Sequence, residues 1–188
     1  GLRYYVRKNS RPERRAELRL VVNAGSVLED DDQRGLAHFV EHMAFNGTAH
    51  FAKQALVDYI EGIGMRFGAD LNASTSFDET VYQLLVPTDS AHTLQRGFLI
   101  LEDWARGVSF DTAEIRKERG VVVPEKSVIA RRNDLDAQIR GVAQQLVGDL
   151  VDERAQLLVG ELGDDGICPD FRIPGNQHRL LSDQKRAF

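Results

Sequence analysis

The sequence has 188 residues, of which 42% are hydrophobic and 28% charged, a composition typical of one globular domain. No apolar run approaches the roughly 20 residues that a membrane span requires. The formal net charge of −5 disfavours a nucleic-acid partner, whose phosphates attract basic surfaces. The single cysteine, Cys168, excludes an intrachain disulfide and a zinc site of four cysteines.

Strands and helices are both predicted, from apolar residues that recur at periods of 2 and 3.6. The predicted strands are residues 3–8, 16–22, 65–75 and 79–86. The predicted helices are residues 33–45, 52–62, a stripe from Leu94 to Ala105, a segment from Asp111, and 134–159. Asp32 is the expected N-cap of the first helix, and Asp111 with Glu114 forms an expected capping box.

The order of these elements indicates an α+β fold, with helices packed on one face of a mostly antiparallel sheet. We expect residues 1–188 to form a single domain. The sequence opens at Gly1 directly before a strand and stops at Phe188 within a predicted helix. We therefore expect the chain to be a fragment of a longer, multi-domain protein.

The segment His38-Phe39-Val40-Glu41-His42 is the most informative one for function. On a helix, its two histidines and its glutamate share an arc of about 100°, and the histidines lie one turn apart. Apolar neighbours on the opposite side can attach the helix to the core. The pattern therefore predicts a metal site, although two solvated histidines on an acidic surface helix are the alternative.

His-x-x-Glu-His is the inverted form of a zinc-peptidase motif, in which the glutamate is a base. A catalytic zinc ion keeps three protein ligands and one open position, so a further ligand must come from another element. Glu118 and Glu125, seven residues apart, are the candidates, and either can instead be a surface residue beside the neighbouring basic side chains.

Beyond this motif, the chain resembles the pitrilysin family of zinc peptidases, which includes insulin-degrading enzyme and the mitochondrial processing peptidase. The similar blocks follow the family's order and cover residues 1 to about 130. They are Ala24–Ser26, Gly35–Thr48, Leu71–Thr75, Asp78–Tyr82 and Glu118–Val122.

The resemblance implies His38 and His42 as zinc ligands and Glu41 as the base that activates water. It implies Glu125 as the third ligand and Glu118 as a nearby carboxylate that orients the site, with the reverse assignment as the alternative. Residues 65–70 lengthen the interval before this pair, as in the bacterial branch similar to the zinc peptidase associated with the cofactor PQQ.

The resemblance also implies that the strand with Asn72 and Ala73 is an edge strand that binds a peptide substrate by strand addition. The implied activity is that of an endopeptidase for short or unfolded polypeptides. Family members use further homologous domains, of the same chain or a second subunit, to close the site. The branch suggests a bacterial periplasmic location.

Two other functions compete with this interpretation. A small zinc lyase resembling S-ribosylhomocysteinase also carries the motif, but Cys168 does not lie where its cysteines are needed. A non-catalytic family member that acts as a scaffold is the other alternative, although such members usually lose the zinc residues. His50, His92 and His178 are expected to be surface or capping residues.

Overall fold

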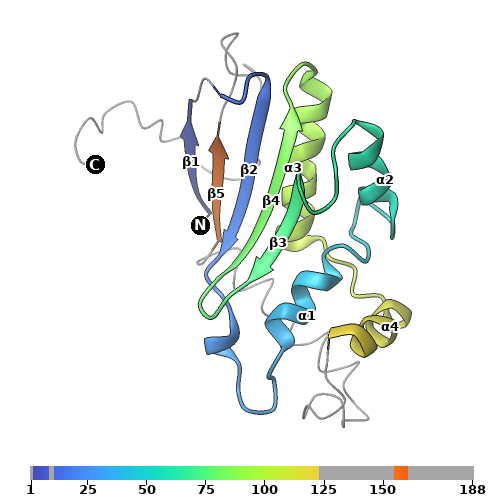
Figure 1. The fold of residues 1–188 in the computed structure, drawn as a ribbon. Helices are drawn as coiled ribbons and strands as arrows, with labels where there is room; N and C mark the ends of the chain where they lie inside the picture. Colours follow the sequence, from blue (N-terminus) through green and yellow to red (C-terminus); the bar gives the residue numbers. More distant parts are fainter. Residues whose placement is uncertain (1, 9–10, 123–154, 161–188) are drawn as a thin grey trace, which may run out of the picture.

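Figure 1 shows the computed structural model of the protein, in which residues 2–8, 11–122 and 155–160 are described. The elements in chain order are β1 (Arg3–Arg7), β2 (Arg15–Val22), the 3-10 helix η1 (Ser26–Leu28), α1 (Leu36–Met43), α2 (Ala55–Gly62), β3 (Leu71–Thr75), β4 (Thr80–Pro87), α3 (Ala91–Arg106), α4 (Thr112–Val122) and β5 (Ala155–Gly160).

The strands form one five-stranded sheet in the order β1-β5-β2-β4-β3. Every neighbouring pair is antiparallel except β1 and β5, which run parallel. The central strand β2 alternates strictly, with Ala16, Leu18 and Leu20 buried, and Leu18 lies opposite the buried Leu84 of β4. This period of two places one face of the sheet against the core.

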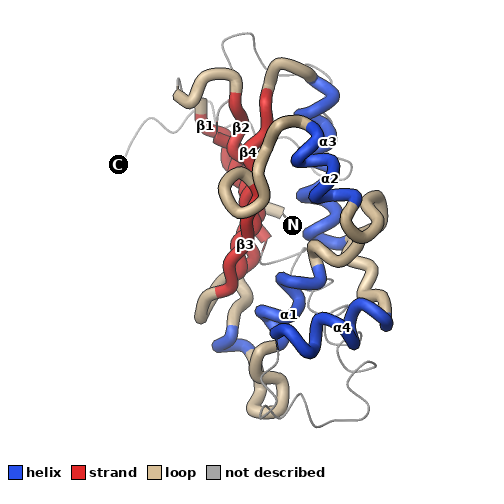
Figure 2. Tube along the Cα trace, turned by 45° about the vertical axis from the view of Figure 1, so that its right-hand side comes forward, coloured by secondary structure: helices blue, strands red, loops and turns tan. Residues whose placement is uncertain are grey.

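The helices cover that face, as Figure 2 shows with the sheet and the helices as separate layers. The long helix α3 buries Ile100, Leu101 and Trp104 against the sheet. At Gly97 a side-chain Cβ would lie 2.9 Å from Cδ1 of Leu18, so the missing side chain allows α3 to approach β2 closely. The predicted α+β class, with helices on one face of a mostly antiparallel sheet, is confirmed.

Two predictions about local structure are wrong. The N-cap of α1 is Gly35, in the left-handed region at φ 94°, and not Asp32. The Glu29 carboxylate accepts hydrogen bonds from the backbone N–H groups of Gly35 and Ala37, so it neutralises the start of the helix from outside. Residues 155–159, predicted as the end of the helix 134–159, belong instead to β5, because they pair with β1 on one side and β2 on the other.

The predicted strand 65–75 is shorter in the structure, since only Leu71–Thr75 pairs with β4. The start of α4 agrees with the sequence in the role of Asp111, whose Oδ1 accepts hydrogen bonds from the N–H groups of Ala113 and Glu114. The Glu114 carboxylate pairs with Lys53. The rest of the predicted helix 134–159 lies outside the described residues.

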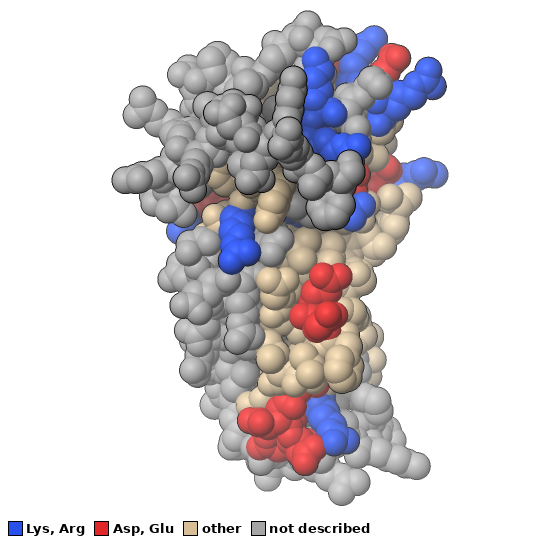
Figure 3. Space-filling model, turned by 90° about the vertical axis from the view of Figure 1, so that its left-hand side faces the viewer, with Lys and Arg blue, Asp and Glu red and all other residues tan. Residues whose placement is uncertain are grey.

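Charged side chains are unevenly distributed on the surface. In Figure 3, most of the coloured Lys and Arg side chains lie toward the upper end of the molecule, and Asp and Glu form one patch near the middle of this face and another at its lower end. Among the described residues, no helix combines the length and the apolar character needed to cross a bilayer.

Candidate metal centre

The short helix α1 separates an apolar side from a side that carries nitrogen and oxygen donors. Leu36, Phe39 and Met43 are buried against the core. His38 is exposed and His42 is half-buried. This division follows from the spacing, because residues three and four apart share one face of a helix.

The two histidines turn the same ring nitrogen toward each other. Nε2 of His42 lies 3.1 Å from Nε2 of His38, and the rings meet edge to face with centroids 4.7 Å apart. The donor atoms of His38, Glu41 and His42 all lie within 4.8 Å of one another. The helix thus brings three potential ligand atoms to one point at the surface.

Glu118, on α4, contacts the opposite nitrogen of the His42 ring. Its Oε1 lies 2.7 Å from Nδ1 of His42, and its Oε2 accepts a hydrogen bond of 3.0 Å from the side-chain amide of Asn46. A carboxylate can only accept, so in the neutral ring the proton sits on Nδ1 and the lone pair on Nε2. Glu118 therefore selects the tautomer that a metal ligand requires.

An ion pair also holds α4 in place. Lys53, just before α2, pairs with Glu114, which lies one helical turn before Glu118. The hydrogen bond that the exposed Lys53 amine donates to the Glu114 carboxylate is the main cause that raises the pKa of Lys53. This pair fixes the helix that carries Glu118 against the segment that follows α1.

The Glu41 carboxylate is buried, with only 8% of the residue exposed. Its Oε2 accepts a hydrogen bond of 2.6 Å from the hydroxyl of Thr75, the last residue of β3. Among the described residues no cation pairs with Glu41. A buried carboxylate of this kind needs hydrogen-bond donors to offset its loss of hydration.

The residues fit a zinc ion. With zinc–nitrogen distances of about 2.0–2.1 Å and tetrahedral angles, the nitrogens of two imidazole ligands lie about 3.3 Å apart. The two Nε2 atoms of His38 and His42 are 3.1 Å apart in the structure. In zinc sites, a histidine ligand commonly donates the N–H of its other ring nitrogen to a carboxylate, as His42 does to Glu118.

Among the described strands β3 pairs only with β4, so the strand that carries Thr75 lies at the edge of the sheet; an isolated bridge joins Phe67 to Leu71 at its start. Asn72 is exposed on this strand, and its side-chain oxygen accepts a hydrogen bond of 2.9 Å from the N–H of Ala73. In the described part of the chain, the outer edge of β3 beyond Leu71 pairs with no other strand, and β3 contacts the helix that bears the histidines.

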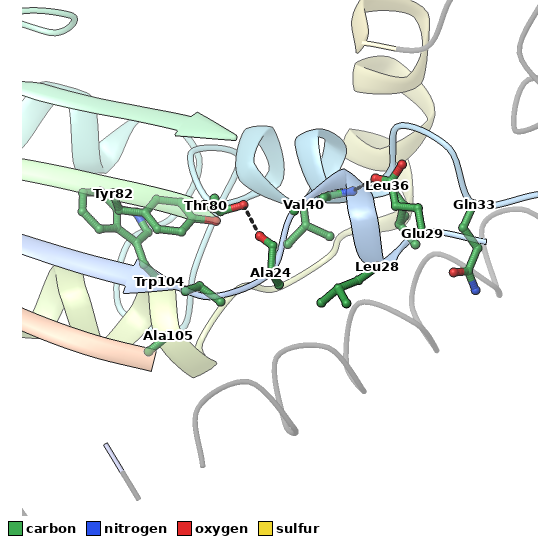
Figure 4. Close-up of a pocket in the computed structure, with 13 residues that line it drawn as sticks. Ala24, Leu28, Glu29, Gln33, Leu36, Val40, Thr80, Tyr82, Trp104 and Ala105 are labelled. Atoms are coloured by element: carbon green, nitrogen blue, oxygen red, sulfur yellow. Dashed lines mark hydrogen bonds between the residues drawn. The ribbon is translucent and has the colours of Figure 1, made fainter. Parts of the chain in front are cut away.

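A small apolar pocket lies on the other side of α1. Figure 4 shows residues of η1, α1, β4 and α3 around it, together with Ala24 of the loop after β2. Its volume is about 70 Å³, far below the roughly 300 Å³ of a typical ligand site. Leu36, Ala37 and Val40 of α1 line it, and the two histidines do not. The pocket is therefore separate from the donor cluster.

Several predicted residues fall outside this cluster. Glu125, the predicted third ligand, lies outside the described residues, as do Cys168 and His178. His50 is exposed as expected, and its Nδ1 lies 2.7 Å from the buried Asp103 carboxylate. His92 is exposed on α3.

Two contacts of the cluster were not predicted from the sequence. Asn46 lies four residues after His42, so helical spacing could have placed it beside the histidine, but the predicted helix ends at residue 45. Thr75 belongs to a segment that resembles the family, yet 34 residues separate it from Glu41. No local pattern joins such distant residues.

Comparison with known proteins now gives the class: the family model described as "Insulinase (Peptidase family M16)" matches residues 4–146. The chain belongs to this family of peptidases.

Among curated relatives, the "Probable zinc protease PqqL" of Escherichia coli K12 is 37% identical over 171 residues, which cover 86% of this chain and 18% of that protein. The protein of the same name from Haemophilus influenzae is 43% identical over 125 residues, covering 66% of this chain and 14% of that protein. The chain thus spans only a small part of these relatives.

A solved structure gives the same result for the fold. The crystal structure of the first half of the periplasmic protease PqqL from Escherichia coli superposes with a TM-score of 0.73 at 30% identity, covering 87% of this chain and 41% of that one. The predicted family and its PQQ-associated branch are confirmed.

Proposed function

We propose that this chain carries the zinc-binding and water-activating residues of an endopeptidase that cleaves short or unfolded polypeptides. The observation that carries the proposal is the convergence of His38, His42 and Glu41 within 4.8 Å, with the Glu118 carboxylate on the far side of His42. The names of the relatives, which call them zinc proteases, support the same chemistry.

In this proposal His38 and His42 hold zinc through their Nε2 atoms, and Glu125 supplies the third ligand. When bound, zinc polarises the carbonyl of the scissile bond and lowers the pKa of a water molecule. Glu118 keeps the proton on Nδ1 of His42 and so keeps Nε2 available as a ligand.

Glu41 then acts as the general base. One of its carboxylate oxygens accepts a proton from the attacking water and later delivers it to the nitrogen of the leaving amine. Water supplies the hydroxyl group of the new carboxyl end, and the peptide C–N bond breaks. The burial of Glu41 beside the two histidines supports this role.

The substrate would bind as an added strand along β3. Its backbone would pair with the outer edge of that strand around Asn72 and Ala73, and the N–H of Ala73 would exchange the Asn72 side chain for a peptide carbonyl. Backbone pairing gives affinity without demanding particular side chains, which suits an enzyme for varied peptides.

We further propose that the chain is one domain of a longer protein, and that homologous domains of the same chain or of a second subunit complete the site. The small share of the relatives that the chain spans supports this proposal. The Escherichia coli relative is described as periplasmic, which supports export to the periplasm. Cell fractionation of the complete gene product tests the location.

The test of the function combines zinc content and peptide hydrolysis in the complete gene product. We expect Glu41→Gln to keep zinc and lose hydrolysis, and His42→Ala to lose both. His92→Ala, a histidine exposed on α3, is the matched control and should change neither. Hydrolysis by Glu41→Gln at the rate of the unaltered protein would contradict the mechanism.

The third ligand is tested by the same assay. Glu125→Gln should release zinc, whereas Glu118→Gln should retain it with weaker affinity. If Glu118→Gln releases the metal and Glu125→Gln retains it, the two assignments are exchanged. Absence of zinc from the unaltered protein contradicts the proposed function.

A further inference from the structure

Glu41 is held by a residue of the edge strand. The Thr75 hydroxyl, at the end of β3, lies 2.6 Å from Oε2 of Glu41 on α1, across 34 residues of sequence. Thr75 is half-buried and Glu41 is buried. The contact joins the helix that carries the histidines to the strand at the edge of the sheet.

The direction of this hydrogen bond follows from its surroundings. Thr80 lies opposite Thr75 in the β3–β4 register, and its hydroxyl is 2.9 Å from the carbonyl of Ala24 and 3.4 Å from the Thr75 oxygen. The dashed line in Figure 4 marks the bond from Thr80 to Ala24. A carboxylate can only accept, so the Thr75 hydroxyl donates to Glu41, while Thr80 directs its own proton mainly to the Ala24 carbonyl.

Thr80 also fixes the position of the Thr75 side chain. It is buried, with 6% of the residue exposed, and its bond to Ala24 anchors the start of β4 to the loop after β2. Thr75 faces it across the strand pair, so the β-branched side chain has little freedom of rotation. The donor to Glu41 is therefore presented by a rigid part of the sheet.

We propose that Thr75 is a positioning residue for Glu41, one whose hydroxyl fixes Oε2 so that the carboxylate stays aligned with the two histidines. The inference rests on the proposed role of Glu41 as the base. Glutamate has three rotatable side-chain bonds, and among the described residues Thr75 is the donor that restrains its carboxylate. A base held in this way loses less freedom when it receives the proton of water.

The same contact links substrate binding to the base. If a peptide adds to the outer edge of β3, the strand that aligns the peptide is the strand that presents the Thr75 hydroxyl. The strand β3 then positions both the peptide bond that reacts and the carboxylate that acts as the base. Small displacements between them cost large factors in rate.

The test uses Thr75→Val, which keeps the shape and removes the hydroxyl, and Thr75→Ser, which keeps the hydroxyl. In the zinc-loaded complete gene product we expect Thr75→Val to lower kcat by about 10- to 100-fold. KM and zinc content should not change, and Thr75→Ser should restore most of kcat. Thr93→Val, a half-buried threonine of α3, is the matched control and should keep kcat.

Retention of kcat by Thr75→Val overturns the inference, and so does an equal loss in the valine and serine variants or a loss of zinc. Crystal structures of the unaltered protein and of Thr75→Val give a measurement independent of activity. One Glu41 conformation in the former and several in the latter support the inference, whereas the same single conformation in both overturns it. If the unaltered protein cleaves no peptide, the proposed function fails and this structural comparison still decides the role of Thr75.

Discussion

The Glu118 carboxylate lies 2.7 Å from Nδ1 of His42, while Nε2 of the same ring points to His38 at 3.1 Å. The His42 imidazole therefore contacts a carboxylate of α4 through Nδ1 and the other histidine of α1 through Nε2. The arrangement fixes both the orientation and the tautomer of the ring before any metal binds. It also places Glu118 on the side of the His42 ring that faces away from His38.

We expect Glu118→Gln to weaken zinc binding by about 10- to 100-fold, the usual effect of losing a carboxylate behind a metal-bound histidine. Competition with a chromophoric chelator measures the affinity. Glu61→Gln, which neutralises an exposed glutamate of α2, is the control for the change in charge. Equal zinc affinity in Glu118→Gln and the unaltered protein means that the carboxylate does not orient His42.

The buried Asp103 carboxylate connects the segment after α1 to α3. It is 2% exposed and accepts hydrogen bonds from the Thr48 hydroxyl at 2.5 Å and from the backbone N–H of His50 at 3.0 Å, beside the His50 ring. This cluster holds the loop that follows α1, the helix that carries His38 and His42.

Asp103→Asn should lower the free energy of unfolding by about 2–4 kcal/mol, because an amide replaces a charged acceptor that several donors share. Urea denaturation measures the change. Glu102→Gln removes the neighbouring half-buried carboxylate, which pairs with Arg106, and should change stability by less than about 0.5 kcal/mol. Similar midpoints for the two variants contradict a structural role for Asp103.

Local features of the site could be predicted from the sequence, and non-local ones could not. His38, Glu41 and His42 share a face because helical spacing alone decides it. The contact between Thr75 and Glu41 depends on how β3 is placed against α1, and no spacing reveals that. The prediction that Asp32 caps α1 was wrong for a related reason. The loop before α1 brings the Glu29 carboxylate, and not that of Asp32, to the N–H groups of Gly35 and Ala37.

The strand β5 illustrates the same limit. Residues 155–160 read Ala-Gln-Leu-Leu-Val-Gly, a composition compatible with helix or strand. Their place between β1 and β2 is set by pairing with strands near the other end of the chain. Long-range pairing of this kind overrides local preference.

Gly25 is packed against the backbone of the β3–β4 turn, which fills the space where a side chain would lie. A Cβ at this position would be 2.4 Å from the carbonyl oxygen of Ser76 and 2.7 Å from the backbone carbon of Phe77. The N–H groups of Ser26 and Val27 bond to that same turn, at 3.2 Å and 2.8 Å.

We expect Gly25→Ala to lower the free energy of unfolding by about 1–3 kcal/mol, since the backbone must move apart. Gly62→Ala is the matched control, because no atom lies within 4 Å of a Cβ there. It should leave stability unchanged or raise it by up to about 1 kcal/mol through better helix propensity. Thermal or urea unfolding compares the two, and equal stability of both variants contradicts the close packing at Gly25.

The buried phenol of Tyr82 should make the free energy of unfolding depend on pH in the alkaline range. Burial, and to a lesser extent the Glu41 carboxylate, raises the pKa of its phenol above the ordinary value. The folded protein therefore holds the phenol proton more tightly than the unfolded chain does. This contribution to stability is fully present below pH ~10, the pKa of an unperturbed tyrosine, and is lost as the pH rises above that value.

Above pH ~10 we expect the free energy of unfolding to fall by up to about 1.4 kcal/mol per pH unit from this one group. Tyr82→Phe, which keeps a ring stacked on Trp104, should remove that part of the pH dependence. Tyr5→Phe changes an exposed tyrosine of β1 and should leave the alkaline fall intact. Urea denaturation at pH 8 and pH 11 compares the three proteins. If the free energy of unfolding decreases as much in Tyr82→Phe as in the unaltered protein, other groups cause the alkaline sensitivity.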